Sequence, residues 1–282
     1  MGVSGPRSWA LTAVAALFAG VTVLPLVWMV SVSLMPAGAA NHFPPPLWPA
    51  HPTFENYRLL LRPSGALGTT DFHIGRAFVN SLALAMLATG FGLAVTVPAG
   101  YAFAKLRFRG RERLLQTLLA LVVVPAQVAM LPLFLLLKWT HLVNSYAGVL
   151  APGLAGIYAV LFVRQAMLGL PDELLDAARV DGASERRIFM AIVLPLLTPV
   201  VVTLALFAFL ASWSDFMWPL IVLTDQHLYT LPVALAAMSR EHAGDTELMM
   251  AGSVITTLPV LLVFLALQRF YFTGMLGGGI KG

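Results

Sequence analysis

Six stretches of this chain are apolar over lengths that suit a membrane interior. Each has few or no charged residues across roughly the 20 positions that a helix needs to cross about 30 Å of hydrocarbon. Only 11% of all residues are charged, and the mean hydropathy is +0.85. The pattern predicts an all-α polytopic membrane protein with six transmembrane helices. Their approximate bounds are 9–34, 77–104, 114–137, 143–163, 192–223 and 248–268.

The placement of lysine and arginine orients these segments. If both termini are cytoplasmic, 12 of the 17 basic residues fall on the cytoplasmic side and five on the outer side. Cytoplasmic loops carry such an excess, which also accounts for the basic pI of about 9.7 without nucleic-acid binding. The first apolar run is about 26 residues long, against 7–15 in a signal peptide, so we expect an uncleaved anchor.

Several kinds of chemistry lack their sequence motifs. There is no cysteine, no G-x-x-x-x-G-K-[ST] phosphate loop, no H-E-x-x-H and no G-x-S-x-G, and the six histidines are scattered. We therefore expect no cofactor or metal in this chain and no enzymatic activity of its own. A secondary transporter would need coupling charges within the membrane or an inverted repeat. Only Asp215 lies within a predicted span, and no such repeat is visible.

One short segment interrupts the apolar pattern. Eight of the 30 charged residues lie between Asp172 and Arg187, on the predicted cytoplasmic side between the fourth and fifth spans. Pro171 and the acids after it suit the first turn of a helix. Asp181-Gly182 predicts a turn, and Ser184 can cap a second helix. The segment therefore predicts a short helix, a tight turn and a second helix.

The first of these helices has a face with small side chains. Leu174, Ala177, Ala178 and Asp181 share that face at helical spacing. The alternative is a helix lying on lipid headgroups, but five acids against three bases disfavour contact with anionic lipid. A protein partner with a groove explains the shallow face better.

At these residues the chain resembles a known family. D-A-A-x-x-D-G-A at 176–183, followed by I-x-L-P at 192–195, resembles the cytoplasmic signature of binding-protein-dependent ABC importer permeases. That signature usually begins with glutamate, where this chain has Asp176. Further segments resemble the carbohydrate-uptake permeases related to the maltose system, and the similarity spans nearly the whole chain. They include FVNSLALA (78–85), YAFAKLRFRGR (101–111), VVVPAQVAMLPLF (122–134), FVRQAMLGLPDELLDAARVDGAS (162–184), SDFMWPL (214–220) and LQRFYFTGMLGGGIKG (267–282).

The resemblance implies partners and a coupling site. It implies a bacterial plasma-membrane protein with both termini cytoplasmic, surrounded by membrane lipid. Its partners would be a second, non-identical permease subunit, an ABC ATPase dimer that binds ATP and Mg, and an extracytoplasmic solute-binding protein. The implied ATPase-coupling residues are Asp176, Ala177, Ala178, Asp181, Gly182, Ala183, Leu194 and Pro195.

The resemblance also implies how the chain is divided into domains. Residues 1–76 would form an N-terminal transmembrane anchor with an extracytoplasmic loop. Residues 77–270 would form the importer transmembrane domain, with a coupling loop at 171–195 between spans four and five. Residues 271–282 would form a cytoplasmic tail.

The sequence is less specific about which residues would contact a solute. SWSDFMWPL (212–220) can be either an aromatic belt with a hydrated acid or a polar, stacking surface for a hydroxylated solute. Asn80 and Gln127 can line a pathway or bridge helices by hydrogen bonds. The pathway candidates are Asn80, Gln127, Trp213, Ser214, Asp215 and Trp218. We expect ATP-driven import of a saccharide or similar polyol. The alternatives are glycerol phosphate or another non-sugar solute in the same family, and then a secondary transporter.

Overall fold

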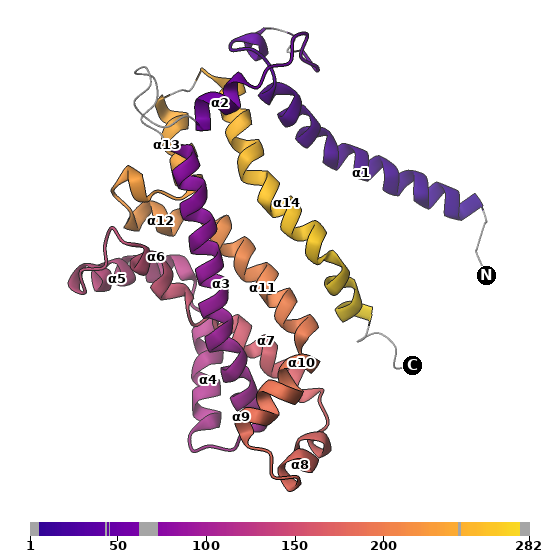
Figure 1. Ribbon diagram of the computed structural model, residues 1–282, viewed down its shortest axis with the longest axis vertical. Coiled ribbons are helices and arrows are strands. Elements are labelled where there is room, and N and C mark those ends of the chain that lie inside the picture. Colours follow the sequence, from indigo (N-terminus) through magenta and orange to yellow (C-terminus); the bar gives the residue numbers. More distant parts are fainter. Residues whose placement is uncertain (1–5, 43, 45, 62–72, 242–243, 277–282) are drawn as a thin grey trace. The chain divides into compact units, whose positions relative to one another are not determined.

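The fold is described here from a computed structural model (Figure 1). It describes every residue except 1–5, 43, 45, 62–72, 242–243 and 277–282. The described residues form helices joined by turns and contain no strand, which confirms the all-α prediction. They group into two compact units. One comprises residues 1–76 and 234–259, and the other comprises 77–233 and 260–282.

The N-terminal unit contains the long helix α1 (Pro6–Ser33), the short turn η1 (Ala39–Asn41) and α2 (Glu55–Leu61). The apolar side chains of α1 are exposed along most of its length, as expected for an anchor in lipid. Asn56 is buried, and its amide donates 2.9 Å hydrogen bonds to the carbonyl oxygens of Ser33 and Met35. These bonds fix α2 against the end of α1.

A second contact in this unit ties η1 to the start of the last long helix, α14 (Thr246–Leu276). Glu247 is buried, and its Oε1 accepts a 2.7 Å hydrogen bond from the backbone N–H of Ala40. Asn41 donates to the carbonyl of Gly244 at 3.3 Å. The turn η1 is thereby held by residues more than 200 positions away.

The second unit contains most of the remaining helices, and the unit boundaries fall inside α3, α13 and α14. Their bounds are α3 (Ile74–Lys105), α4 (Arg111–Val122), α5 (Ala126–Trp139), α6 (Tyr146–Leu150), η2 (Ala151–Gly153), α7 (Ile157–Leu168), α8 (Asp172–Val180), α9 (Glu185–Ile188), η3 (Phe189–Val193), α10 (Leu194–Leu196), α11 (Thr198–Trp213), α12 (Met217–Val222), η4 (Gln226–Leu228) and α13 (Leu231–Glu241).

Three of the six predicted spans are bent rather than straight. Residues 11–33, 74–105 and 246–268 form continuous apolar helices of membrane-spanning length. The other three segments are helix pairs, bent by 105° between α4 and α5, by 40° between α6–η2 and α7, and by 77° between α9–α10 and α11. The helices therefore reach six spans if each bent pair counts as one.

The 77° bend before α11 falls between two prolines, because the helices meet at Leu197, with Pro195 two residues before it and Pro199 two residues after it. Proline lacks a backbone N–H and its ring crowds the carbonyl four residues earlier. A π-helical turn, η3, ends at Val193, two residues before Pro195. The predicted fifth span, 192–223, is also divided later, because α11 ends at Trp213 and α12 begins only at Met217.

Close packing between α3 and α7 depends on Gly100. A Cβ at this position would lie 2.5 Å from the Cβ of Val163 and 3.0 Å from the carbonyl oxygen of Val160. A larger residue would force the two helices apart. At the other end of the chain, α14 continues to Leu276, so the first residues of the expected tail are helical, and 277–282 lie outside the described residues.

Candidate functional site

The charged segment folds as a capped helix followed by a second helix. Pro171 has an extended backbone (φ −60°, ψ 133°) directly before α8, and Asp172 and Glu173 occupy its first turn. Ser184 caps α9, its hydroxyl accepting a 3.4 Å hydrogen bond from the N–H of Arg187. These are the local signals that predict both helices from the sequence.

The turn between the helices requires glycine. Gly182 has φ +79°, a left-handed conformation that other residues adopt at a free-energy cost. Its N–H donates to the carbonyl of Arg179 at 3.0 Å, and the N–H of Ala183 donates to that of Ala178 at 2.9 Å. This pair of bonds is the Schellman motif, which satisfies the free carbonyls at the end of α8. The Asp181-Gly182-Ala183 part of the signature is thus a helix stop of defined geometry.

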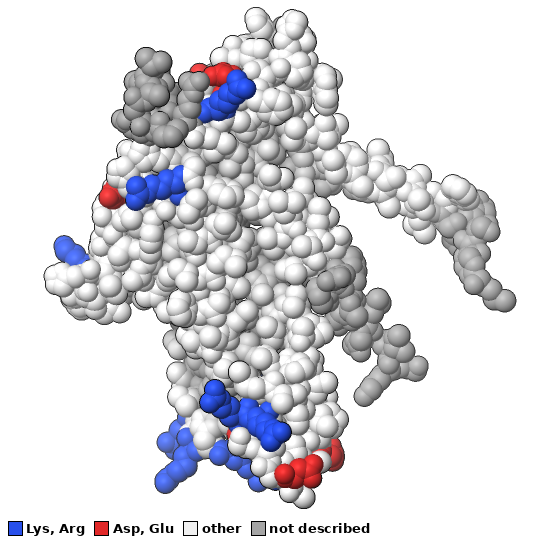
Figure 2. Space-filling view, in the orientation of Figure 1, with Lys and Arg blue, Asp and Glu red and all other residues white. Residues whose placement is uncertain are grey.

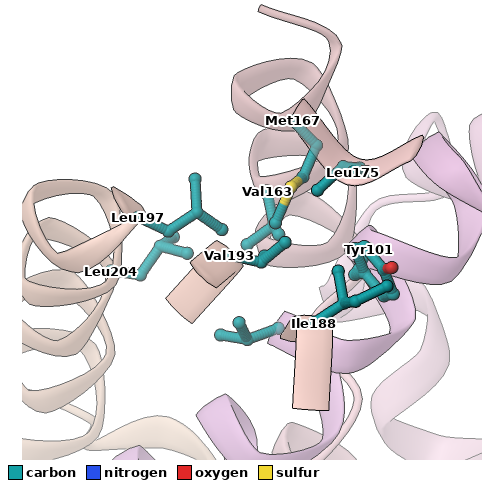
Figure 3. Close-up of a cluster of buried hydrophobic side chains, with 9 residues drawn as sticks. Tyr101, Val163, Met167, Leu175, Ile188, Val193, Leu197 and Leu204 are labelled. Atoms are coloured by element: carbon teal, nitrogen blue, oxygen red, sulfur yellow. The ribbon is translucent and has the colours of Figure 1, made fainter. Parts of the chain in front are cut away.

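One face of α8 is buried in an apolar cluster (Figure 3). Leu175 is 1% exposed and lies in this cluster with Met167 from α7 and Tyr101 from α3. Ala178 and Ala183 pack against its edge. The other members are Val97, Val163, Ile188, Val193, Leu197 and Leu204. Because the cluster draws from α3, α7, α8 and α9–α11, it joins the charged segment to three of the longer helices of the unit.

Hydrogen-bonded charges surround this apolar contact. Arg179 donates through Nε to Oε1 of Glu185 at 2.7 Å and through Nη1 to Oδ1 of Asp176 at 2.6 Å. The hydroxyl of Tyr101, on α3, donates to the second oxygen of Glu185 at 2.7 Å. Asp176, the first residue of the signature, is therefore held within its own helix by Arg179.

A second polar tie joins α8 to the end of α3. The Nζ of Lys105 donates to the carbonyl of Leu170 at 2.7 Å and to Oδ1 of Asp172 at 2.5 Å. The Lys105 side chain is only 6% exposed, so its charge depends on these two acceptors. The Lys105 ammonium holds the pKa of the Asp172 carboxyl below its usual value by hydrogen bond and charge. Figure 2 shows both signs of charge gathered at the α8 end of the second unit.

The opposite face of α8 is exposed. Leu174 is 43% and Val180 is 87% exposed, and Ala177 and Asp181 are also accessible. Helical spacing predicted Ala178 on this face, whereas the structure turns it partly inward toward the cluster. Leu194 is half-buried at the edge of the same cluster, and Pro195 is exposed. The outward face, defined here as Leu174, Ala177, Val180 and Asp181, is mostly apolar and has acids at its edge.

A cavity of about 810 Å³ lies in the same unit, lined by residues of α3, α5, α6, α7, α11 and α12. Most of the lining is apolar, including Met130, Phe162 and Phe207. Polar side chains enter at Thr96, Tyr158, Ser212, Asp215 and Thr230. A volume in the range of roughly 300–1,000 Å³ with few polar groups is usual for small-molecule sites.

The structure separates the six pathway candidates into two groups. Asp215 and Trp218 line the cavity, and Asp215 Oδ1 accepts a 3.4 Å hydrogen bond from the N–H of Trp218. The others are absent from the lining. Trp213 is 1% exposed and packs edge-on against Phe78. Gln127 and Ser214 are exposed, and Asn80 forms hydrogen bonds to the backbone elsewhere.

Sequence reasoning missed Thr230, which the structure places in the cavity wall. Thr230 is 3% exposed, and its hydroxyl oxygen has no hydrogen-bond partner within the described part of the chain. It lies in a loop between apolar segments, where no local pattern marks it. In the same described ranges, no three acidic or histidine side chains gather where they could hold a metal ion.

Comparisons with known proteins agree on one family. The profile described as "binding-protein-dependent transport system inner membrane component" matches residues 96–275. The chain is 35% identical over 277 residues to the arabinooligosaccharides transport system permease protein of Halalkalibacterium halodurans, covering 98% of this chain and 97% of that protein. It is 34% identical over 200 residues to the lactose transport system permease protein of Rhizobium radiobacter, covering 71% and 73%.

A solved structure shows the same fold. It belongs to a bacterial ABC transporter involved in the import of the acidic polysaccharide alginate. The TM-score is 0.78 with 21% identity, over 96% of this chain and 100% of that chain. At that identity the likeness concerns the fold alone.

Proposed function

The chain belongs to the binding-protein-dependent transport system inner membrane components, the permeases of ABC importers, and on this premise we propose that it moves a saccharide or similar polyol into the cytoplasm. Such a permease is a transport component rather than an enzyme. Because this chain has no phosphate-binding loop, the proposal assigns ATP and Mg to a separate ATPase dimer. A second, non-identical permease subunit completes the pathway, and an extracytoplasmic binding protein delivers the solute.

The proposal assigns ATPase docking to the outward face of α8. The small side chain of Ala177 allows a close approach there, and the acids at the edge of the face can pair with basic groups of a partner. Asp176 and Arg179 are bonded to each other, so the edge of the face is held in one conformation. Pre-ordered side chains lose less conformational entropy when a partner binds.

The observation that carries the proposal is how firmly α8 is joined to the longer helices. Leu175 is buried among residues of α3, α7 and α9–α11, while Tyr101 and Lys105 bond the segment to α3. A close-packed interior transmits displacement rather than absorbing it. Movement imposed on α8 by an ATPase would therefore move α3, α7 and α11 with it.

Gly182 offers a direct test of this coupling. Gly182→Val places a β-branched residue at φ +79°, which disfavours the turn by about 1–2 kcal/mol. Gly110→Val is the matched control, since Gly110 has φ +85° in the α3–α4 turn and, like Gly182, has open space where a Cβ would lie. Both variants should insert at normal abundance. In proteoliposomes containing the full transporter, we expect Gly182→Val alone to lose most of its uptake per ATP hydrolysed. Equal coupling in both variants would remove the role assigned to this turn.

The saccharide part of the proposal rests on the relatives named for arabinooligosaccharides and lactose. It is tested by uptake of labelled arabinotriose and lactose by the complete transporter, with glycerol 3-phosphate as the non-sugar alternative. ATP-dependent uptake of a sugar supports the proposal. Uptake of glycerol 3-phosphate alone would replace the substrate class while leaving the importer role intact.

A further inference from the structure

The residues that line the cavity of the second unit indicate which solutes it can bind, and they do so more narrowly than the family assignment does. We propose that it is a site for neutral saccharides that excludes anionic solutes, with the Asp215 carboxylate and the Thr230 hydroxyl as its polar contacts. This inference rests on the proposed import function and specifies the solute that the pathway admits.

Thr230 is the strongest sign that the cavity accepts a polar ligand. Its Oγ1 is buried without a partner in the described structure, and the residue lines the cavity. Buried hydroxyl groups in folded proteins are nearly always hydrogen-bonded, because an unpaired one is unfavourable. A hydroxyl group of a sugar can both donate to and accept from this oxygen.

The backbone on both sides of Thr230 is fixed by α3. Asn80 donates from Nδ2 to the carbonyl of Tyr229 at 3.0 Å, and the N–H of Leu231 donates to Oγ of Ser81 at 2.7 Å. Asn80 also donates to the carbonyl of His227 at 3.0 Å. Asn80 and Ser81 are therefore positioning residues that hold Thr230 at the cavity wall, and neither lines the cavity itself.

Asp215 sets the charge preference of the site. It carries the only formal charge among the described lining residues, which include no lysine, arginine or histidine. Its Oδ1 has one long bond, 3.4 Å from the N–H of Trp218, so the carboxylate retains capacity to accept sugar hydroxyls. A phosphate or uronate group here would meet a carboxylate and find no cation, whereas proteins bind such anions with arginine, lysine or helix N-termini.

The rest of the lining suits the apolar faces of a sugar. Trp218 is fixed by a 3.2 Å hydrogen bond from Nε1 to the carbonyl of Gly148, and Phe162 and Phe207 also line the cavity. Aromatic and aliphatic walls with few polar groups are the usual make-up of a small-molecule site. A lipid acyl chain would match these walls but would leave the Thr230 hydroxyl without a partner and Asp215 with only its long bond from Trp218.

A cysteine introduced into the cavity measures its charge preference directly. The chain contains no cysteine, so Ser212→Cys creates one reactive thiol in the lining, three residues before Asp215. The complete transporter in membrane vesicles is treated with cationic or anionic methanethiosulfonate reagents, and each rate is divided by that of a small free thiol. Modification is read as a mass shift on this chain, which requires neither uptake nor ATP hydrolysis.

We expect the cationic reagent to react about tenfold faster than the anionic one. Adding Asp215→Asn should bring the two corrected rates together. Lactose and arabinotriose should slow modification, whereas lactobionate, the aldonate formed by oxidising the reducing end of lactose, should not. Thr230→Ala should reduce the protection by neutral sugars, and Thr230→Ser should preserve it.

Three results would overturn the inference. They are equal corrected rates for both reagents with Asp215 present, protection by lactobionate equal to that by lactose, and an absence of protection by any of the sugars, which would favour a lipid occupant. Coupled uptake in the same preparation separates these failures from a failure of the importer role.

Discussion

The α8 segment and the cavity belong to the same unit, but their polar groups differ in how fully they are hydrogen-bonded. Around α8, the charged groups of Arg179, Glu185 and Lys105 each make two hydrogen bonds. In the cavity, Thr230 Oγ1 has no partner within the described residues, and Asp215 has one long bond. A satisfied network stabilises one geometry, as transmission of force requires. An incomplete one leaves bonding capacity for a ligand and lowers the stability of the empty protein.

The largest effect should separate the two faces of α8. Leu175→Ala opens the apolar cluster and should lower the free energy of unfolding by about 2–5 kcal/mol. Leu174→Ala, one position away on the outward face, should change it by about 0.5 kcal/mol or less while weakening ATPase binding. Thermal unfolding of the detergent-solubilised transporter measures the first effect, and co-purification of the ATPase measures the second. Equal losses of stability would mean that α8 has no distinct inner face.

The polar network around α8 should respond to loss of one hydroxyl. Tyr101→Phe removes the 2.7 Å bond to Glu185 and should lower the free energy of unfolding by about 1.5 kcal/mol, the lower range for a bond to a charged group. Tyr158→Phe is the control, because that hydroxyl makes only a 3.5 Å exposed contact with the carbonyl of Val122. Unchanged stability in Tyr101→Phe would remove this bond from the set that holds α8 to α3.

Loss of a hydroxyl in the cavity should change the free energy of unfolding in the opposite direction. Thr230→Val removes an unpaired hydroxyl at nearly constant volume and should raise the free energy of unfolding by about 1 kcal/mol. Solute uptake should fall in the same variant. Thr96→Val is the control from the same wall, since its hydroxyl donates to the carbonyl of Gly92 at 2.7 Å, and its loss should destabilise. Destabilisation by both variants would show that Thr230 is satisfied in the protein.

The smallest effect concerns the pH dependence of the Lys105–Asp172 pair. Because Lys105 lowers the pKa of Asp172 in the folded state, the pair stabilises the fold above the unfolded pKa of about 4. That contribution is lost as the pH falls through the lower, folded pKa. Asp172→Asn should therefore reduce the unfolding temperature slightly at pH 7, and the difference from wild type should begin to shrink near pH 4 and vanish only below the lower, folded pKa. A difference that does not shrink as the pH falls below about 4 would indicate a cause other than ionisation.

Local rules predicted the α8 segment well. Pro171, the acids after it, the Asp181-Gly182 turn and the Ser184 cap act on neighbouring backbone groups, so the sequence contains all the information that they need. The predicted orientation of Ala178 was wrong, because it packs against the buried cluster. Ala177 and Ala178 both suit a shallow face, and only the position of the apolar cluster around Leu175 decides which of the two faces inward.

The bends and the cavity depend on contacts distant in sequence. Pro125 stands at the 105° break, whereas Pro98 lies inside the continuous helix α3, so proline alone does not locate a break. Thr230 becomes part of the cavity wall through Asn80 and Ser81, about 150 positions earlier. The sequence singled out Asn80 as a polar residue near a span, but its partner could be identified only in three dimensions.

The claim that ATPase docks on the outward face of α8 is tested most directly by cross-linking. Because the native chain has no cysteine, Ala177→Cys can carry one photoreactive maleimide in the assembled transporter. Thr117→Cys, exposed on α4, provides the control. We predict an ATPase adduct at position 177 and none at position 117. An adduct at 117 alone, or none at 177 in a transporter that hydrolyses ATP and takes up sugar, would contradict the account.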